Sequence, residues 1–256
     1  MPAISIKNIN KTYIDQDGNE VQALHDINLD VAEGEFVCIV GPSGCGKSTL
    51  LEIVAGLLDA TSGEVLLDGQ PVHGTSRDIG VVFQDASLFP WRTVRKNVAF
   101  GLEIAGVPRE EREERLRRYI SMVSLNGFEN KYPAQLSGGM RQRTLAMNPK
   151  VILMDEPFSA VDHLTKCTLQ EELINIRQAE NKTVLFVTHD INEAVFLADR
   201  VVLLSPRPST IQKIYEIPLE QKRGRSDPLL LKIAAEIAKD INSGGQDIPN
   251  NYWGNL

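Results

Sequence analysis

The fold of this chain is constrained most by residues 41–49, which read Gly-Pro-Ser-Gly-Cys-Gly-Lys-Ser-Thr. A short apolar run at 36–40 precedes this stretch, and a helical pattern at 50–58 follows it. A strand, a glycine-rich turn and a helix in that order point several backbone N–H groups and a helix N-terminus at one place, which suits an anion. The pattern therefore predicts a phosphate-binding loop inside an α/β fold.

Residues of this loop have separate expected tasks. The glycines let the backbone wrap around phosphates without a Cβ in the way. Lys47 can reach the β- and γ-phosphates of a nucleotide, and the Ser48 hydroxyl can bind Mg²⁺. The predicted nucleotide-binding residues of the loop are Gly41, Pro42, Ser43, Gly44, Cys45, Gly46, Lys47, Ser48 and Thr49.

Cys45 carries an expectation of its own, since it stands beside Lys47 near a helix N-terminus. Both features favour the thiolate form of a cysteine. We expect alkylation of Cys45 to block nucleotide binding and MgATP to protect it. The alternative is an unreactive loop cysteine.

Composition narrows the class of protein. The chain has 256 residues, 42% of them hydrophobic, and a net charge of −7, so its charge does not favour nucleic acid as the main partner. Three scattered cysteines fit neither a disulfide framework nor a metal cage and indicate a reducing compartment. We see no signal peptide and no apolar run near the ~20 residues that span a bilayer, so any membrane passage is expected of another chain.

Periodicity along the chain indicates how the fold is organised. Residues 1–35 look β-rich, and further strands are expected at 64–68 and 79–83. A helical region starts near Thr93, and residues 110–123 have a clear helical period. Beyond residue 150 the expected order is strand 151–154, helix 164–180, strand 183–187, helix 191–199, strand 200–204 and a last helix from 228 to about 241. This alternation predicts a parallel sheet with helices on both faces.

Two carboxylates follow the predicted strand at 151–154. In a doubly wound sheet that strand carries Asp155 and Glu156 to the edge where the phosphate loop lies. Asp155 is expected to hold Mg²⁺ and Glu156 to polarise the attacking water as a general base. An ordinary turn is the alternative interpretation of the acidic pair.

A second motif makes the prediction specific. Residues 136–143, Leu-Ser-Gly-Gly-Met-Arg-Gln-Arg, resemble the signature motif of ABC-transporter ATPase subunits. Other motifs follow the family order: Tyr13 resembles the adenine-stacking aromatic, Gln84 the Q-loop glutamine, residues 159–162 the D-loop, and His189 the switch histidine. The resemblance runs from residue 3 to about 240.

The resemblance implies a fold and a division of the chain. It implies a P-loop NTPase core with a mostly parallel sheet, an N-terminal antiparallel β subdomain and a helical subdomain that carries the signature motif. We expect one ABC ATPase domain at 1–241, with the helical subdomain at about 92–148. Residues 242–256 are polar and are predicted to form a mobile tail.

The resemblance also assigns roles. It implies that Gln84 contacts Mg²⁺ and the attacking water and that His189 contacts the γ-phosphate, which makes Glu156, His189 and Gln84 the expected catalytic residues and Ser48, Gln84 and Asp155 the expected Mg²⁺ residues. A second ATPase subunit, identical or related, is expected to close head to tail on the first around two ATP molecules. The residues expected to touch the ATP of that partner are Leu136, Ser137, Gly138, Gly139, Met140 and Asp162.

A loop after Gln84 predicts the contact with a membrane permease. Leu88, Phe89 and Trp91 are apolar residues outside any periodic element, and we expect them to receive a permease helix. The alternative is a loop folded back onto the core. The amino-acid sequence of this loop resembles that of the nitrate, sulfonate, taurine and bicarbonate branch of bacterial importers. The resemblance implies a peripheral subunit on the cytoplasmic face of the inner membrane. It also implies a solute-binding protein that meets this subunit only indirectly. It does not name the solute.

One spacing departs from the family. Ser137 lies only 18 residues before Asp155. Relatives carry ~5 more residues in the helix between them, a loss of about 7–8 Å of helix and a rotation of about 140°. We expect weak or absent ATPase activity if this is a true deletion.

Other classes of protein remain as alternatives. A soluble ABC-type ATPase acting on DNA, ribosomes or Fe–S assembly shares the same motifs, but such proteins carry long insertions or a second cassette. A P-loop kinase is disfavoured by the signature motif and the switch histidine. An exporter half usually has its permease fused to the ATPase.

Overall fold

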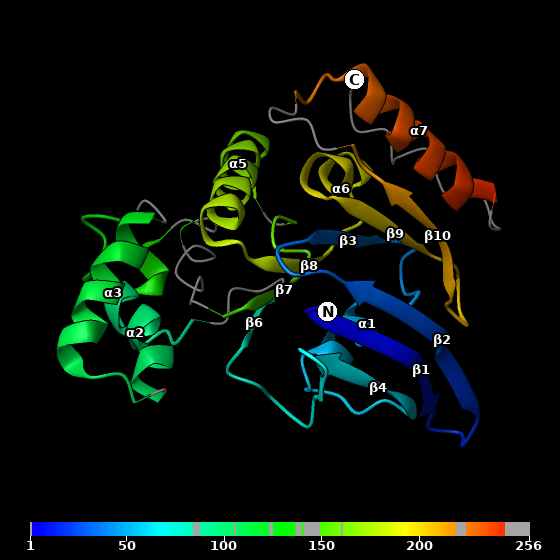
Figure 1. Ribbon diagram of the computed structural model, residues 1–256, viewed down its shortest axis with the longest axis horizontal. Helices are drawn as coiled ribbons and strands as arrows, with labels where there is room; N and C mark the ends of the chain where they lie inside the picture. Colours follow the sequence, from blue (N-terminus) through cyan, green and yellow to red (C-terminus); the bar gives the residue numbers. More distant parts are fainter. Residues whose placement is uncertain are drawn as a thin grey trace.

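Two β-sheets form the body of the protein, and a pair of helices lies to one side of them (Figure 1). The computed structural model describes residues 2–83, 88–104, 106–122, 125–136, 140, 149–159, 161–218 and 224–243. None of the helices in these ranges is long and apolar enough to cross a membrane.

The smaller sheet is antiparallel and comes from the N-terminal part of the chain. Its strands are β1 (Ile4–Ile14), β2 (Glu20–Val31), β4 (Ser62–Leu67) and β5 (Gln70–Pro71), in the order β2-β1-β4-β5. Register shifts interrupt the pairing of β1 with β2, so the side chains do not alternate regularly along these two strands. The predicted antiparallel β subdomain is therefore present.

The larger sheet is mostly parallel. Its order is β10-β9-β3-β8-β7-β6, and only β10 runs antiparallel to its neighbour. The strands are β3 (Phe36–Val40), β6 (Ile79–Val82), β7 (Val151–Asp155), β8 (Thr183–Val187), β9 (Arg200–Leu204) and β10 (Ile211–Glu216). The sequence patterns located five of these strands to within one residue and missed β10, whose residues are mostly polar and exposed.

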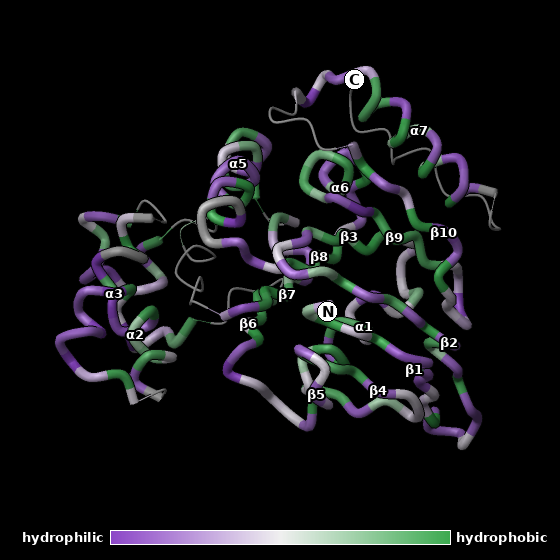
Figure 2. Tube along the Cα trace, in the orientation of Figure 1, coloured by the Kyte–Doolittle hydropathy of each residue, from purple (hydrophilic) through white to green (hydrophobic). Residues whose placement is uncertain are grey.

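The central strands are buried on both faces, and their side chains alternate between two cores. In β3, Val37 and Ile39 pack with the N-terminal sheet and α1 (Lys47–Val54). Phe36, Cys38 and Val40 pack on the opposite face against the helices there. Those helices are α5 (His163–Glu180), α6 (Ile191–Leu197) and α7 (Pro228–Ser243). Figure 2 shows the resulting hydrophobic centre of the molecule.

The remaining helices form a third, smaller core. The helices α2 (Val94–Ile104) and α3 (Arg109–Met122) pack together through Val98, Leu102, Leu116 and Ile120. Ile176 of α5 joins this cluster and links it to the body of the protein. A short 3₁₀ turn, η1 (Pro133–Gln135), leads toward the signature region. The helical subdomain predicted at 92–148 includes residues 141–148, which lie outside the described residues.

Candidate active site

The carboxyl ends of four parallel strands meet at one edge of the larger sheet. The phosphate loop follows β3, Asp155 ends β7 and Glu156 follows it, His189 lies just past β8, and a loop with Arg207 follows β9. Ligands of open α/β sheets bind at this edge. A cavity of about 540 Å³ lies there, lined by Tyr13, Ala23, Ser43, Gly44, Gly46, Lys47, Ser48, Thr49, Glu156, His189 and Arg207.

The phosphate loop has a backbone that depends on glycine. Gly46 has φ 111°, and a Cβ placed there would lie 2.8 Å from Cδ2 of Leu24. α1 begins at the next residue, so the first N–H groups of that helix are free of intrahelical partners. Ser48 and Thr49 of this first turn line the cavity. The loop and helix therefore have the backbone geometry that an anion site requires, and anion binding stays a prediction.

Lys47 is buried beneath the loop and held by it. Its Nζ donates hydrogen bonds to the carbonyl oxygens of Gly41 and Pro42, both at 3.0 Å. The two carbonyl oxygens are neutral and do not cancel the positive charge of the ammonium group, which is therefore available to an anion that enters the cavity. Gly41 and Pro42 themselves are not among the residues that line the cavity.

The expectation of a reactive Cys45 thiolate is wrong for this structure. The Cys45 side chain is only 2% exposed and packs in the core below the loop. Burial raises the pKa of the thiol, and the attraction of Lys47 does not offset it. The sequence places Lys47 near the sulfur, but the burial of Cys45 depends on packing with the N-terminal sheet, which no local pattern predicts.

Asp155 and Ser48 provide the oxygen ligands that Mg²⁺ prefers. The Ser48 side chain is hydrogen-bonded to the Asp155 carboxyl. Burial raises the pKa of Asp155, and the charge of Glu156 raises it further, against the lowering effects of Ser48 and Lys47. Among the described residues, no group of three or more His, Cys, Asp and Glu could hold a metal on its own. The two residues fit a Mg²⁺ that takes its other ligands from phosphate and water.

Glu156 and His189 are paired across neighbouring strands. Nδ1 of His189 lies 2.8 Å from Oε2 of Glu156, and because a carboxylate only accepts, the imidazole donates at this nitrogen. Glu156 has φ 44°, a conformation that costs about 1–3 kcal/mol for a residue with a side chain. Its N–H donates to the carbonyl oxygen of Val187 at 2.9 Å, which helps to hold this backbone. Such stored strain is common where a side chain must point at a ligand.

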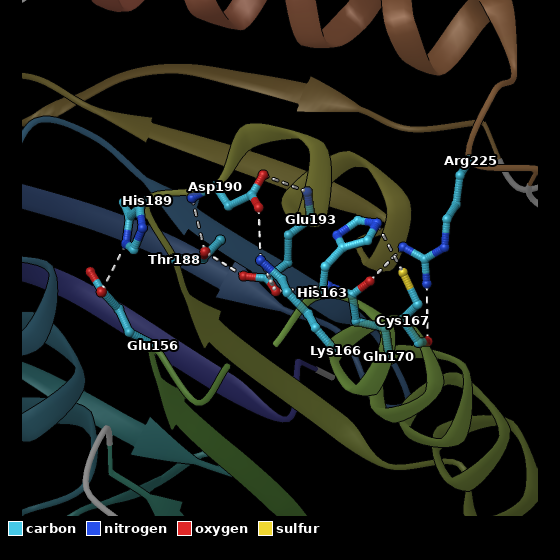
Figure 3. A network of polar contacts seen from close by, with 10 residues as sticks. All are labelled: Glu156, His163, Lys166, Cys167, Gln170, Thr188, His189, Asp190, Glu193 and Arg225. Atoms are coloured by element: carbon cyan, nitrogen blue, oxygen red, sulfur yellow. Dashed lines mark hydrogen bonds and ion pairs between the residues drawn. The ribbon is translucent and has the colours of Figure 1, made fainter. Parts of the chain in front are cut away.

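A buried polar network supports the loop that carries His189 (Figure 3). The Thr188 hydroxyl donates to Oε2 of Glu193 at 2.5 Å and accepts from the N–H of Asp190 at 3.0 Å. Asp190 caps α6 by accepting from the N–H of Glu193 at 3.1 Å. Lys166 of α5 lies 2.7 Å from Asp190 and 3.2 Å from Glu193. The loop is thereby fixed to both α5 and α6.

The charges within this network stabilise one another. Burial alone would lower the pKa of Lys166, but Glu193 and Asp190 raise it above its ordinary value. Burial alone would raise the pKa of Asp190, but Lys166 and two backbone N–H groups lower it. Lys166 is therefore a cation and Asp190 an anion at neutral pH.

The same network reaches the start of α7 (Figure 3). Gln170 of α5, buried, donates to Glu193 at 2.8 Å and accepts from Arg225 at 2.6 Å. The Arg225 guanidinium also lies 4.0 Å from the ring centroid of Phe196. Sequence reasoning missed these partners, although the Asp190 cap before a helical pattern was a usable signal.

Tyr13 also lines the cavity. The residue is 40% exposed, and its hydroxyl is 3.3 Å from Oγ1 of Thr49. Nζ of Lys11 lies 5.2 Å from the ring centroid. An exposed aromatic face beside the phosphate loop can receive a nucleobase, and stacking on adenine stays a prediction.

Several predicted residues lie elsewhere. Gln84, Ser137, Gly138 and Gly139 lie outside the described residues, as does the short spacing at 141–148. Leu136 is buried, and Met140 packs against the core of α2 and α3. Asp162 caps α5 by accepting from the N–H of Thr165 at 3.1 Å. Leu136, Met140 and Asp162 do not line the cavity of the single chain, and their contact with a partner's nucleotide stays a prediction.

The residues predicted to contact the permease differ in exposure. Leu88 is only 9% exposed and offers little surface to a partner, which corrects its assignment to the contact surface. Trp91 is 71% exposed, and its ring lies 5.6 Å from that of Phe89. Phe89 in turn packs edge-on against Phe100, and Arg92 lies over both phenyl rings. Trp91 is thus an exposed aromatic residue that packs against Phe89.

Comparisons with known proteins agree with this arrangement. The ABC transporter family profile matches residues 24–159, more than half of the chain. An uncharacterized ABC transporter ATP-binding protein of Methanocaldococcus jannaschii, MJ0412, is 52% identical over 239 residues, covering 91% of this chain and 89% of that protein. The nitrate import ATP-binding protein NrtD of Synechocystis sp. is 49% identical over 221 residues, covering 84% of this chain and 83% of that protein.

A solved structure is similar over most of the fold. It is the dimeric, post-hydrolysis state of the ATP-binding cassette MJ0796 bound to ADP and Pi. The two chains are 35% identical with a TM-score of 0.74, and the match covers 85% of this chain and 100% of that one.

Proposed function

Because this chain belongs to the ABC transporter ATP-binding family, we propose that it is the ATP-hydrolysing subunit that energises a membrane importer for a small solute. The observation that carries the proposal is the paired Glu156 and His189 beside Lys47 at one edge of the sheet. That arrangement combines an anion site with a carboxylate positioned to accept a proton. ATP hydrolysis needs both.

The residues suggest how hydrolysis proceeds. Lys47 is released from the carbonyls of Gly41 and Pro42 and binds the terminal phosphates. Glu156 accepts a proton from the water that attacks the γ-phosphorus, while the bond to the β–γ bridging oxygen breaks and ADP leaves. His189 donates from Nδ1 to the Glu156 carboxylate, and it would contact the γ-phosphate through Nε2 when that nitrogen also carries a proton. Gln84 orients the water.

Ser48 and Asp155 are the residues that would hold Mg²⁺. Their hydroxyl and carboxyl oxygens fit this hard cation. When bound, Mg²⁺ neutralises negative charge on the phosphates during the reaction. The raised pKa of Asp155 is consistent with a carboxyl that needs a cation beside it.

A second subunit is proposed to complete each site. The solved relative MJ0796 is a dimer, which supports a head-to-tail pair here. Leu136, Met140 and Asp162, together with Ser137 to Gly139, would face the nucleotide of the partner.

The permease contact is proposed for Trp91 and Phe89. Trp91 is exposed and packs against Phe89, which packs against Phe100. Such a tryptophan supplies an apolar anchor of the kind found at the centre of interfaces. The subunit would lie on the cytoplasmic face of the membrane and meet the solute-binding protein only through the permease. The 49% sequence identity with the nitrate import protein NrtD supports nitrate or a similar small solute as the transported substrate.

Reconstitution tests this function. The chain is combined with a candidate membrane permease, and ATPase activity is measured with and without that protein. We expect Trp91→Ala to abolish co-purification and stimulation while leaving the activity of the isolated subunit unchanged. Leu57→Ala, which removes an exposed apolar residue from another surface, is the control. An active subunit that no membrane protein binds or stimulates would favour the soluble ABC-type ATPase.

The short spacing before Asp155 defines a second candidate, a subunit with impaired turnover. Insertion of five residues after Arg143 tests it. Increased turnover on insertion would favour the impaired variant, and unchanged turnover would refute it.

A further inference from the structure

The loop after β9 places a positive charge at the nucleotide cavity that no family motif accounts for. Arg207 lines the cavity opposite the catalytic pair. The strand order β9-β3-β8 sets this geometry, because the phosphate loop follows β3 and is flanked by Arg207 on one side and His189 on the other. Arg207 therefore approaches the loop from the side away from Glu156.

The loop that carries Arg207 is held in place by hydrogen bonds of Ser209. Ser209, two residues later, is 0% exposed. Its N–H donates to the carbonyl oxygen of Ala23 at 3.0 Å, and its own carbonyl accepts from the N–H of His25 at 2.8 Å. The Ser209 hydroxyl donates to the carbonyl oxygen of Ser205 at 2.9 Å. The loop is thus fastened to β2, which also contributes Ala23 to the cavity wall.

The guanidinium comes close to the phosphate loop. Nη2 of Arg207 lies 3.0 Å from the position that a Cβ would occupy at Gly44. Gly44 has φ 72° and carries no side chain, so the arginine can approach the loop backbone closely. Arg207 forms no ion pair or hydrogen bond with the described residues. A cation at an anion site without a carboxylate partner is available to a ligand.

We propose that Arg207 is a nucleotide-binding residue that contacts the α- and β-phosphates. The γ-phosphate belongs to the side of the loop where Glu156 and His189 lie, so a cation on the opposite side meets the part of the nucleotide that ATP and ADP share. Its contribution is to affinity rather than to the chemical step. The proposal rests on the proposed ATP-binding function.

The test compares Arg207→Gln, Arg207→Lys and a control, Arg77→Gln, in the full chain. Arg77 is an exposed arginine just before β6, at the other edge of the sheet. Calorimetric titration gives the dissociation constants of MgADP and MgATP. Loss of one charge-assisted hydrogen bond predicts about ten- to hundredfold weaker binding of both nucleotides for Arg207→Gln. Arg207→Lys should be intermediate and Arg77→Gln unchanged.

The outcomes separate a binding role from a structural one. We expect the thermal midpoint of the nucleotide-free Arg207→Gln protein to match wild type, and its loss of affinity to shrink as salt is raised. If Arg207→Gln binds both nucleotides as tightly as wild type, the proposal is overturned. It is also overturned if only the affinity for MgATP falls, or if the thermal midpoint falls in both Arg207→Gln and Arg207→Lys. A wild-type chain that binds neither nucleotide would overturn the proposed function itself.

Discussion

Nδ1 of His189 lies 2.8 Å from Oε2 of Glu156, so the two residues proposed for hydrolysis are already paired in the single chain. Glu156 extends from β7 and His189 from β8, which are adjacent parallel strands. A shift of either strand end would therefore change the direction of the carboxylate. This pairing makes the first prediction specific.

Glu156→Gln should retain ATP binding and lose hydrolysis. A positioned general base contributes about a hundredfold or more, and glutamine keeps the shape while removing proton affinity. Phosphate release and ATP affinity are measured on the same preparation. Glu216→Gln, an exposed change on β10, is the control. Hydrolysis within tenfold of wild type would exclude Glu156 as the base.

Asp190→Asn should make stability less sensitive to acid. The folded-state pKa of Asp190 is lowered, so its charge stabilises the fold above its ordinary value of 3.8, and this contribution is lost as pH falls below that value. Asparagine can still cap α6, so the change isolates the ion pair with Lys166. Urea unfolding should show wild type more stable by about 1 kcal/mol at pH 7, with the difference shrinking as pH falls below 3.8. A difference that does not change with pH would mean that the ion pair contributes nothing.

Cys45 should resist alkylation in the folded protein. It is buried with a raised thiol pKa, whereas Cys167 is partly exposed on α5. Mass spectrometry after a short maleimide pulse should find Cys167 labelled first, and MgATP should change little at Cys45. A Cys167→Ser protein gives the background. Rapid labelling of Cys45 that MgATP blocks would show that the thiolate is accessible in solution.

Gly46→Ala should destabilise the fold and weaken nucleotide binding together. The added Cβ would lie too close to Leu24, and alanine also disfavours the positive φ at this position. Backbone strain of this kind costs about 1–3 kcal/mol. Gly18→Ala is the matched control, because it has φ 84° with nothing within 4 Å of the added atom. Chemical unfolding and ATP titration are the measurements. Equal effects of the two changes would show that the contact with Leu24 is unimportant.

The predictable parts of this protein are those with a local pattern. Strands β8 and β9 begin and end where the apolar runs do, and the glycine spacing located the phosphate loop. The loop around Ser209 has no such pattern, since its position depends on backbone hydrogen bonds to Ala23 and His25 far away in the chain. The burial of Cys45 likewise arises from packing between distant segments.

The position of β3 has a consequence for synthesis of the chain. Its neighbours in the sheet are β8 and β9, and Phe36 pairs with Val184. The strand that feeds the phosphate loop therefore has no sheet partner until most of the polypeptide has left the ribosome. Non-local pairing of this kind forms slowly. Nucleotide can thus assist folding only in its last stage, and a nascent chain that stops before residue 183 exposes an unpaired apolar strand to aggregation or chaperones.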